Sequence, residues 1–588
     1  MQHNEDQHVE GLTSKRPLPD QRVLLDFPDP RYIAWALRAW LPRMVGPICI
    51  AVFFFHLAVI HRYAVNIPYW DDWGMISAGA PSLSPKWLLA QHNEHRIPLN
   101  KLLVWLEFHL NGWNYVVHLL LDFLIYGLIL TVIWLFARKM APQVPSWIVL
   151  GFIFFLLSPI NWFNHFMADQ SAAHFYLLFF FLSSYFLFDN RQRWSHLIIG
   201  SVAAGLTAYS LGAGFISIVA MFLAFCLFKG LRVYAAGTTE RPREILQLLL
   251  SVGLVGGCLF TWTIGFVKPP YHPPLTFPHT KVFWQVFLNL ISLGFAIQRL
   301  SSRWGLFCLL IVLTPILGQA WKSKGRLSSA QWAIFAVVLA ILANLAAISM
   351  GRAGFGLMAS KSERYVELIL PLVPLSAINW ALFLQDHEKL KGIALVGLWL
   401  FCSLTFLHKW DFAVYRNAAV ERQAGVECVK GYYEGRRPAL CSTLLPEIHP
   451  FAQILDTGKA LNLSYYQDMR VEIEQKLKTG SESVAPAYIG WHDTADCEHI
   501  TGWAYNKSEP EAMLDVAIAD GNTLLSTTHA YKFRADVLAA GFGTGLYGFD
   551  CPTPLALKDG RVHSVRVRFA NTSLDLLNTP KSLVCSPP

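Results

Sequence analysis

The sequence predicts a polytopic α-helical membrane protein of about eleven transmembrane helices, followed by an extracytoplasmic all-β sandwich domain. Of its 588 residues, 54% are apolar and 15% are charged, whereas about a quarter of the residues of a soluble domain are charged. Apolar segments of roughly 15–22 residues recur from Met44 to Leu407 and then stop. Alternating stretches next to Asp-Gly turns, Leu514–Ile518 and Val562–Phe569, follow near the C-terminus and are typical of strands.

Loop charges predict the orientation of the bundle, because lysine and arginine concentrate in cytoplasmic loops. Residues 1–43 are polar and basic, so we expect a cytoplasmic N-terminal tail with an interfacial helix at Tyr32–Leu41. A first span at Met44–His61 then places the loop 62–113 outside, where Pro85–Leu110 is expected to form one surface helix. The other spans of a transmembrane domain 44–408 are expected at Tyr115–Phe136, Trp147–Ile160, Ala172–Phe188, two helices within His196–Phe228 separated at Ser210–Gly214, Ile245–Phe266, Leu306–Ala320, Trp332–Ser349, Tyr365–Leu384 and Ile393–Leu407.

One apolar segment, Lys281–Gln298, has two interpretations. If it spans the membrane, the basic loop Lys322–Arg326 falls outside; if it is a surface or re-entrant helix, that loop falls inside. We favour the second interpretation, because it agrees with the positive-inside rule. The net charge of +8 does not indicate a nucleic-acid partner, because the basic residues lie in short loops between apolar segments. No glycine-rich phosphate loop is present in the tail, which argues against a nucleotide-driven machine.

The tail divides into an amphipathic, helix-compatible extracytoplasmic linker, 409–480, and the β-sandwich, 481–588. It holds five of the ten cysteines, which favours an oxidising compartment. The preferred disulfides are Cys428–Cys441 and Cys497–Cys585, with Cys551 left over, although spacing alone leaves other pairings open.

An acidic pair, Asp71-Asp72, lies between Trp70 and Trp73 just after the first span. Charges at the membrane boundary are costly to hold, so this pair is the first candidate for a functional site. A helix N-cap or a solvated loop pair is the alternative. About twenty residues later the polar run His92–Arg96 lies in the same outer loop.

Four stretches of the tail resemble a small β-sandwich module appended to bacterial glycosyltransferases and other envelope proteins. They are Ile500–Ala504, Phe533–Asp536, Tyr547–Phe549 and Leu557–His563. Trp491, Trp503 and Tyr505 are expected to fill a small core, and sugar binding is the alternative for them.

The membrane part resembles the GT-C class of glycosyltransferases, integral membrane enzymes that use polyprenyl-phosphate-linked sugars. The resemblance rests on the acidic pair after the first span, the long first outer loop with a surface helix, and the many spans with an added outer domain. It implies transfer of a hexosyl or pentosyl group from a polyprenyl-phosphate donor to an envelope glycan, lipid or protein, at the outer face of a bacterial inner membrane. The first loop lacks an Asp-x-Asp motif, so the resemblance does not settle metal dependence.

This chemistry needs a base for the acceptor hydroxyl and fixed positive charge for the departing phosphate. We expect Asp71 or Asp72 to be the base, with the other orienting it or holding a cation. The candidate substrate-binding residues share a place in the outer loops: Trp70, Trp73, His92, Glu94, His95, Arg96, His165, Asp169, Arg352, Lys361, Arg364 and Tyr365. Among them, Arg96, Arg352, Lys361 and Arg364 are the candidate phosphate ligands, with lipid-headgroup anchoring as the alternative.

His92 and His95 stand three apart and are expected to share a helical face. We expect them to hydrogen-bond to substrate hydroxyls or to the acidic pair. The alternative is a divalent cation, with His165 and Asp169 as further ligands.

Two other classes of function remain open. A transporter or flippase for lipid-linked glycans would have charges deep in several spans, and Asp122 and Glu367 are candidates for this. A non-catalytic glycan-binding assembly protein would not depend on Asp71.

Overall fold

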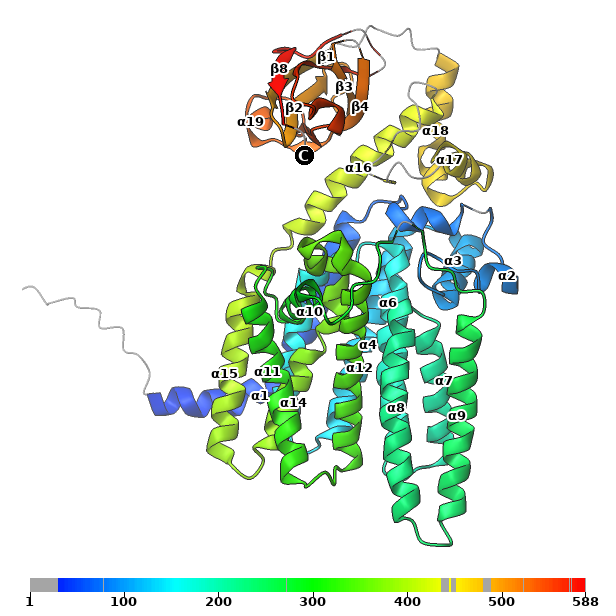
Figure 1. Ribbon diagram of the computed structural model, residues 1–588, viewed down its shortest axis with the longest axis vertical. Coiled ribbons are helices and arrows are strands. Elements are labelled where there is room, and N and C mark those ends of the chain that lie inside the picture. The colour runs from blue at the N-terminus through cyan, green and yellow to red at the C-terminus, as the bar shows by residue number, and fades with distance from the viewer. Residues whose placement is uncertain are drawn as a thin grey trace, which may run out of the picture.

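The computed structural model describes residues 30–434, 441, 444–445, 451–479 and 488–586, except residues 78, 271, 522, 571 and 573. Figure 1 shows a bundle of long helices, a layer of shorter helices at one end of it, and a β-domain beyond that layer. Predominantly helical structure followed by an all-β region of two sheets confirms the predicted fold class at this level.

In the described part of the chain, eight helical segments are long and apolar enough to cross a membrane, so this is an integral membrane protein. Each corresponds to one predicted span. The segments are Trp40–Tyr63, Tyr115–Met140, Gly212–Ala235, Arg241–Thr263, Ser302–Lys322, Ser329–Phe355, Glu363–Phe383 and Glu388–Tyr433. The first segment is the C-terminal part of α1 (Pro30–Tyr63). The others contain the helices α4 (Tyr115–Met140), α8 (Gly212–Ala235), α9 (Arg241–Thr263), α11 (Ser302–Lys322), α12 (Ser329–Arg352), α13 (Val366–Ile369), α14 (Leu372–Phe383), α15 (Glu388–Phe406) and α16 (Ala413–Tyr433).

The other three predicted spans are shorter helices: α5 (Ser146–Ile153), α6 (Ser171–Leu187) and α7 (Trp194–Ala208). The chain turns between α7 and α8 where the Ser210–Gly214 break was expected. Gly214 makes this turn possible, because a Cβ atom there would lie 2.0 Å from the Thr207 carbonyl oxygen.

The ambiguous segment forms α10 (Lys281–Gly294), 14 residues long. At about 1.5 Å per residue it covers only about 21 Å, less than the hydrocarbon thickness of a bilayer. It lies across the end of the bundle that also carries the short helices (Figure 1). This arrangement agrees with the favoured interpretation of a surface or re-entrant helix.

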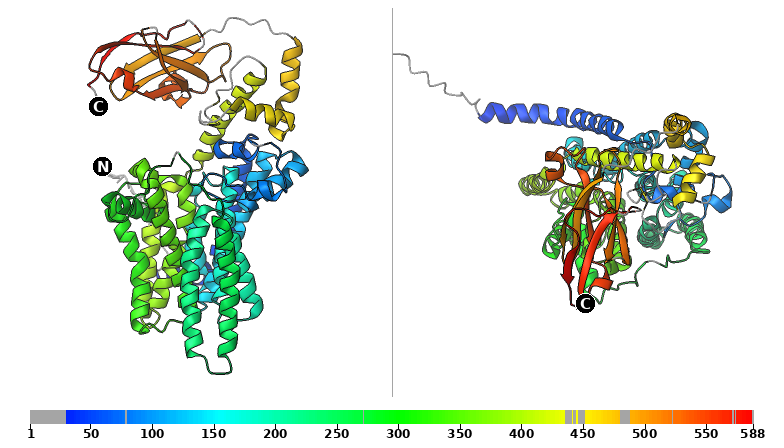
Figure 2. Two further views of the ribbon diagram at one scale, coloured as in Figure 1. Left: turned by 45° about the vertical axis from the view of Figure 1, so that its right-hand side comes forward. Right: turned by 90° about the horizontal axis from the view of Figure 1, so that it is seen from above.

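The N-terminal prediction differs from the structure. Instead of an interfacial helix followed by a separate span, Pro30–Tyr63 is one helix with Pro42 and Pro47 inside it. Its first part extends sideways from the bundle, as the view from above in Figure 2 shows.

The predicted surface helix is also broken in two. The structure has α2 (Pro85–Leu88) and α3 (Pro98–Asn111), with the His92–Arg96 run in the loop between them. Pro98 is the reason, because proline lacks the N–H that a continuous helix needs and favours the first turn of a new one.

The linker packs on the first outer loop through α16, α17 (Phe451–Ala460) and α18 (Ser464–Thr479). Asn66 donates to Ser464 at 2.9 Å and to Asp468 at 2.7 Å, and the Tyr69 hydroxyl donates to Glu421 at 3.2 Å. A disulfide joins Cys428 of α16 to Cys441, one of the two predicted pairs.

The C-terminal domain has two four-stranded sheets, ordered β1-β2-β6-β5 and β4-β3-β7-β8. The strands are β1 (Tyr488–Ala495), β2 (His499–Asn506), β3 (Leu514–Asp520), β4 (Thr523–Ala530), β5 (Lys532–Phe533), β6 (Leu546–Pro552), β7 (Val562–Phe569) and β8 (Lys581–Val584), and a short helix, α19 (Ala535–Ala539), follows β5. Alternate residues of β3 and β7 fill the core between the sheets.

The cysteines and three aromatic residues of the C-terminal domain can be compared with the predictions for them. The second predicted disulfide, Cys497–Cys585, is present, and Cys551 is a free, buried thiol. Trp503 and Tyr505 pack in a small second core, whereas Trp491 is 42% exposed.

Candidate functional site

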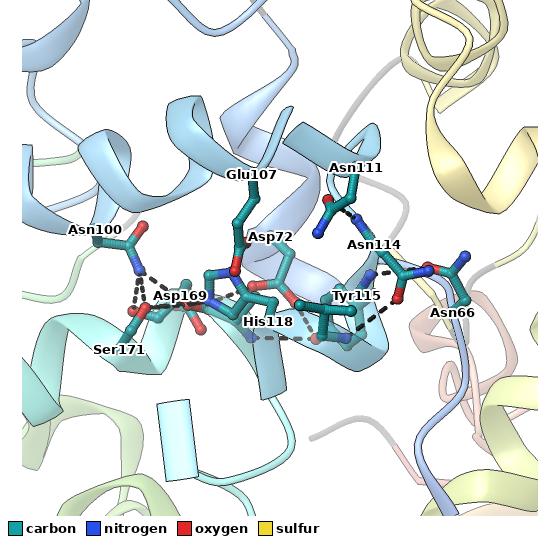
Figure 3. A network of polar contacts seen from close by, with 12 residues as sticks. Asn66, Asp72, Asn100, Glu107, Asn111, Asn114, Tyr115, His118, Asp169 and Ser171 are labelled. Carbon is teal, nitrogen blue, oxygen red and sulfur yellow. Dashed lines mark hydrogen bonds and ion pairs between the residues drawn. The ribbon is translucent and has the colours of Figure 1, made fainter. Parts of the chain in front are cut away.

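The 3₁₀ helix η1 (Trp70–Met75) carries the acidic pair just beyond α1, and Asp72 is fully buried in it. The Asp72 carboxylate accepts from the Tyr115 hydroxyl at 2.5 Å and from the Asp169 backbone N–H at 2.6 Å (Figure 3). It also accepts from the Tyr69 backbone N–H at 3.1 Å. Burial raises the pKa of Asp72 to about 6, and these three donors act in the opposite direction. Asp72 therefore fixes the η1 turn instead of facing a substrate.

The same network holds the loop that carries Asp169. The backbone of Ala168 donates to the Tyr115 hydroxyl at 3.2 Å and accepts from Asn100 at 2.9 Å and from the His118 ring at 3.0 Å. Burial and the charges of Asp72 and Asp71 hold the pKa of Asp169 well above its ordinary range. The charges of Asp72 and Asp71 thus disfavour the ionisation of Asp169.

Asp71 differs from its neighbour. It is half-buried, and its carboxylate makes no hydrogen bond or ion pair with any residue that the structure describes. Its charge nevertheless acts on His92, His95 and Asp169. Asp71 is therefore the member of the pair that can accept a proton from a bound molecule.

The two loop histidines do not share a helical face, contrary to the prediction. His92 and His95 form a tight turn in which each backbone N–H donates to the other's carbonyl at 2.8 Å, with Asn93 at φ 48°. The His95 ring accepts at Nδ1 from the Gly212 backbone N–H at 3.0 Å. Burial lowers the pKa of both histidines to about 4, so both rings are neutral at pH 7.

Two of the four candidate cations hold the backbone together. The Arg96 guanidinium donates to the carbonyls of Leu89, Trp262 and Ile264, at distances of 2.5–2.9 Å. The Lys361 ammonium donates to the Ser292 hydroxyl and to two carbonyls at the end of α10, and burial lowers its pKa to about 8. Both cations thus donate hydrogen bonds to the protein itself, and their roles as phosphate ligands stay predictions.

The other two cations differ in their pairing. Arg352 forms an ion pair with Glu94, and the His272 ring lies 3.4 Å from the same carboxylate. Arg364 is half-buried, lies 5.9 Å from the Phe163 ring centroid, and forms no ion pair with a described residue. Like Asp71, it acts electrostatically on His95 and Asp169. Arg364 is therefore the candidate cation with its charge still available.

The flanking aromatic residues have different surroundings. Trp73, a predicted substrate-binding residue, is fully buried and packs against Phe451 and Tyr465 of the linker, with ring centroids 5.1 and 5.4 Å away. Trp70 is half-buried with φ 50°, a left-handed conformation that β-branched and bulky residues rarely adopt. Tyr365 is half-buried at the edge of the core.

The predicted cation site of His92, His95, His165 and Asp169 is not assembled. Among the described residues, the group of histidine, cysteine and carboxylate side chains close enough to share an ion consists of His165, His174 and Glu367. His165 is fully buried there.

Several residues of the site were missed by sequence reasoning. Tyr115, Asn100 and the buried His118–Glu107 pair are the core of the network around Asp72. Arg422 of the linker donates to the Phe166 carbonyl and lies 4.7 Å from the Tyr69 ring centroid. A polar residue at the first turn of a span was the only available signal for Tyr115, and nothing in the local sequence connects Arg422 to the first loop.

No family model and no curated protein matches this chain. Among solved structures, the chain is similar to ArnT from Cupriavidus metallidurans, crystallised with undecaprenyl phosphate bound. The two share 15% sequence identity over 76% of this chain and 78% of that chain, with a TM-score of 0.36. At this level the similarity supports no inference of function, which must come from the site itself.

Proposed function

We propose that this protein is a membrane glycosyltransferase that moves a sugar from a polyprenyl-phosphate donor to an acceptor hydroxyl of an envelope glycan, lipid or protein. One observation carries the proposal: a carboxylate, Asp71, and a guanidinium, Arg364, neither of which forms an ion pair with a described residue, both act on His95 and Asp169. These are the two charges that the transfer requires, and they lie beside the apolar bundle in which a lipid donor would be anchored.

Asp71 takes the role of general base. As the acceptor oxygen bonds to the anomeric carbon, its proton passes to the Asp71 carboxylate. The bond between the anomeric carbon and the phosphate oxygen breaks, and the electron pair leaves with the phosphate. Arg364 stabilises that charge by charge-assisted hydrogen bonds. Asp72 acts by positioning η1, and the Asp169 carboxyl, whose ionisation burial and the neighbouring carboxylates disfavour, hydrogen-bonds to the donor or the acceptor.

The reaction is placed at the extracytoplasmic face, in a bacterial inner membrane. Support for this comes from the two disulfides, which form in oxidising compartments, and from the basic loops at the opposite end of the bundle, such as Lys322–Arg326.

The test is sugar transfer by the full-length protein in liposomes, with a panel of polyprenyl-phosphate-linked hexoses and pentoses. We expect Asp71→Asn to lower kcat by about 10²–10⁴-fold without loss of donor binding. Arg364→Gln should raise the KM for the donor by about 10-fold or more, since a hydrogen bond to a charged group contributes about 1.5–3 kcal/mol. Asp386→Asn, an exposed carboxylate between α14 and α15, and Arg470→Gln, on the outer surface of α18, are the matched controls.

Two results would overturn the proposal. If Asp71→Asn transfers sugar as well as Asp386→Asn, the base is wrongly assigned. If the wild type consumes no donor while lipid-linked sugars cross the bilayer in every variant, the protein is a flippase.

A further inference from the structure

Three buried side chains from separate elements converge beneath the site. His165 follows the turn η3 (Pro159–Asn161), His174 lies in the first turn of α6, and Glu367 lies in α13. One ligand atom from each lies within 4.8 Å of the others. The three side chains are 0%, 0% and 1% exposed. Two imidazoles and one carboxylate around a common centre are a donor set that binds Zn²⁺.

The partners of these residues orient the ligand atoms toward that centre. Asp122 accepts from His174 Nδ1 at 2.6 Å, which leaves the lone pair on Nε2. Asn164 donates to Glu367 Oε2 at 3.0 Å, which leaves Oε1. A carboxylate behind a histidine and a hydrogen bond to the second oxygen of a carboxylate are the usual outer partners of metal ligands.

The ligand atoms themselves have no hydrogen-bond partner. Both ring nitrogens of His165 are buried without one. His174 Nε2 and Glu367 Oε1 lie 3.1 Å apart but lack the geometry of a hydrogen bond. Each unsatisfied buried polar group costs about 1–3 kcal/mol, so their convergence needs a reason. His56, which packs against His165, shows the contrast, because both its nitrogens have partners, Leu157 and Tyr415.

The charge balance of these buried groups is a second reason to expect a bound cation. Asp122 and Glu367 are both buried, and within the described residues neither pairs with a lysine or an arginine; their ionic partner is His174. A divalent cation bound to neutral His165 and His174 would cancel the charge of both carboxylates, which a single imidazolium cannot do.

We propose that His165, His174 and Glu367 bind a Zn²⁺ ion, with Asp122 and Asn164 orienting two of the ligands. The ion ties together the loop 161–170, α6 and α13. Asp169 follows His165 by four residues and Arg364 precedes Glu367 by three, so the ion also fixes both segments of the candidate active site. That consequence rests on the proposed function, whereas the zinc site does not.

The test uses the full-length protein in detergent, loaded with ZnCl₂, dialysed into metal-free buffer and analysed by elemental mass spectrometry. We expect about one zinc per wild-type chain, with two imidazoles at about 2.0–2.1 Å by zinc X-ray absorption. His165→Phe should lose this zinc, while His56→Phe and Glu94→Gln should keep it. Asp122→Asn, which leaves all three ligands in place, should weaken zinc binding by about 10–100-fold.

The thermal stability of the wild type and of His165→Phe distinguishes a zinc site from simple packing, because a zinc site predicts that His165→Phe is the less stable protein and simple packing predicts the opposite. Chelation should lower the unfolding temperature of the wild type and leave that of His165→Phe unchanged. A wild type that retains no zinc overturns the proposal, as does zinc that is lost in Glu94→Gln but kept in His165→Phe. A His165→Phe variant that is more stable than zinc-treated wild type also overturns it, since it would only have removed two unsatisfied nitrogens. If His165→Phe does not fold, Asp122→Asn is the test: weaker zinc binding than in the wild type supports the site, and unchanged zinc binding overturns it.

Discussion

Replacing Asp72 and replacing Asp71 should have opposite consequences, although the two residues are adjacent. Asparagine at position 72 can accept with only one oxygen, so its amide must face at least one of the three buried donors. An unsatisfied buried N–H costs about 1–3 kcal/mol. Tyr115→Phe removes a hydrogen bond of 2.5 Å to the same carboxylate, worth about 1.5–3 kcal/mol. We therefore expect both variants to unfold at lower temperature than the wild type.

Asp72→Asn and Tyr115→Phe should slow sugar transfer less than loss of the base does. Since about 1.4 kcal/mol corresponds to a factor of ten, a misplaced η1 turn lowers the rate by about 10–100-fold. Asp71→Asn loses no hydrogen bond to any described residue, so its unfolding temperature should stay unchanged while its rate falls by about 10²–10⁴-fold.

Thermal unfolding and transfer rates on the same four proteins, together with the double variant Asp72→Asn/Tyr115→Phe, measure both quantities. The double-mutant cycle should give a coupling free energy between Asp72 and Tyr115 of about 1.5–3 kcal/mol. Because burial places the pKa of Asp72 at about 6, the wild-type rate should fall as the pH drops through 6, and this fall should be missing in Asp72→Asn. If Asp72→Asn folds with wild-type stability and is the less active of the two asparagine variants, Asp72 is the base and our assignment is wrong.

Three further predictions concern the outer region. Trp73→Ala should cost about 3–5 kcal/mol, the loss for a buried tryptophan, and should expose α17 and α18 to limited proteolysis; an unchanged digestion pattern would contradict this packing. Breaking the Cys428–Cys441 disulfide, which closes a loop of 13 residues, should lower stability by about 3 kcal/mol. Thermal unfolding of Cys428→Ala/Cys441→Ala beside the wild type measures this loss, and equal midpoints would contradict it. Burial lowers the pKa of His92 and His95 from 6.5 to about 4, so as the pH falls the unfolded chain binds protons before the folded chain does. The stability present above pH 6.5 should therefore be lost as the pH falls toward 4. His92→Phe should lose less stability over this range, and a wild-type thermal unfolding midpoint independent of pH would refute the prediction.

The sequence determined the architecture because membrane spans and strands are local patterns. Runs of apolar residues identified the long helices, and the Ser210–Gly214 break correctly divided one run into two helices. Alternation correctly located the strands Leu514–Ile518 and Val562–Phe569. Errors occurred where proline acts against the pattern: Pro98 starts a new helix inside the predicted surface helix, and Pro42 is accommodated within α1.

Only the tertiary structure decided which polar residues share a site. Asp71 and Asp72 are indistinguishable in sequence, yet three donors hold Asp72, whereas no described residue hydrogen-bonds to the Asp71 carboxylate. Arg96 and Arg364 both read as cations at the outer face, but helix-end carbonyls occupy Arg96 alone. Long-range partners decide each case, because burial and hydrogen bonding depend on chain segments that the local sequence does not specify.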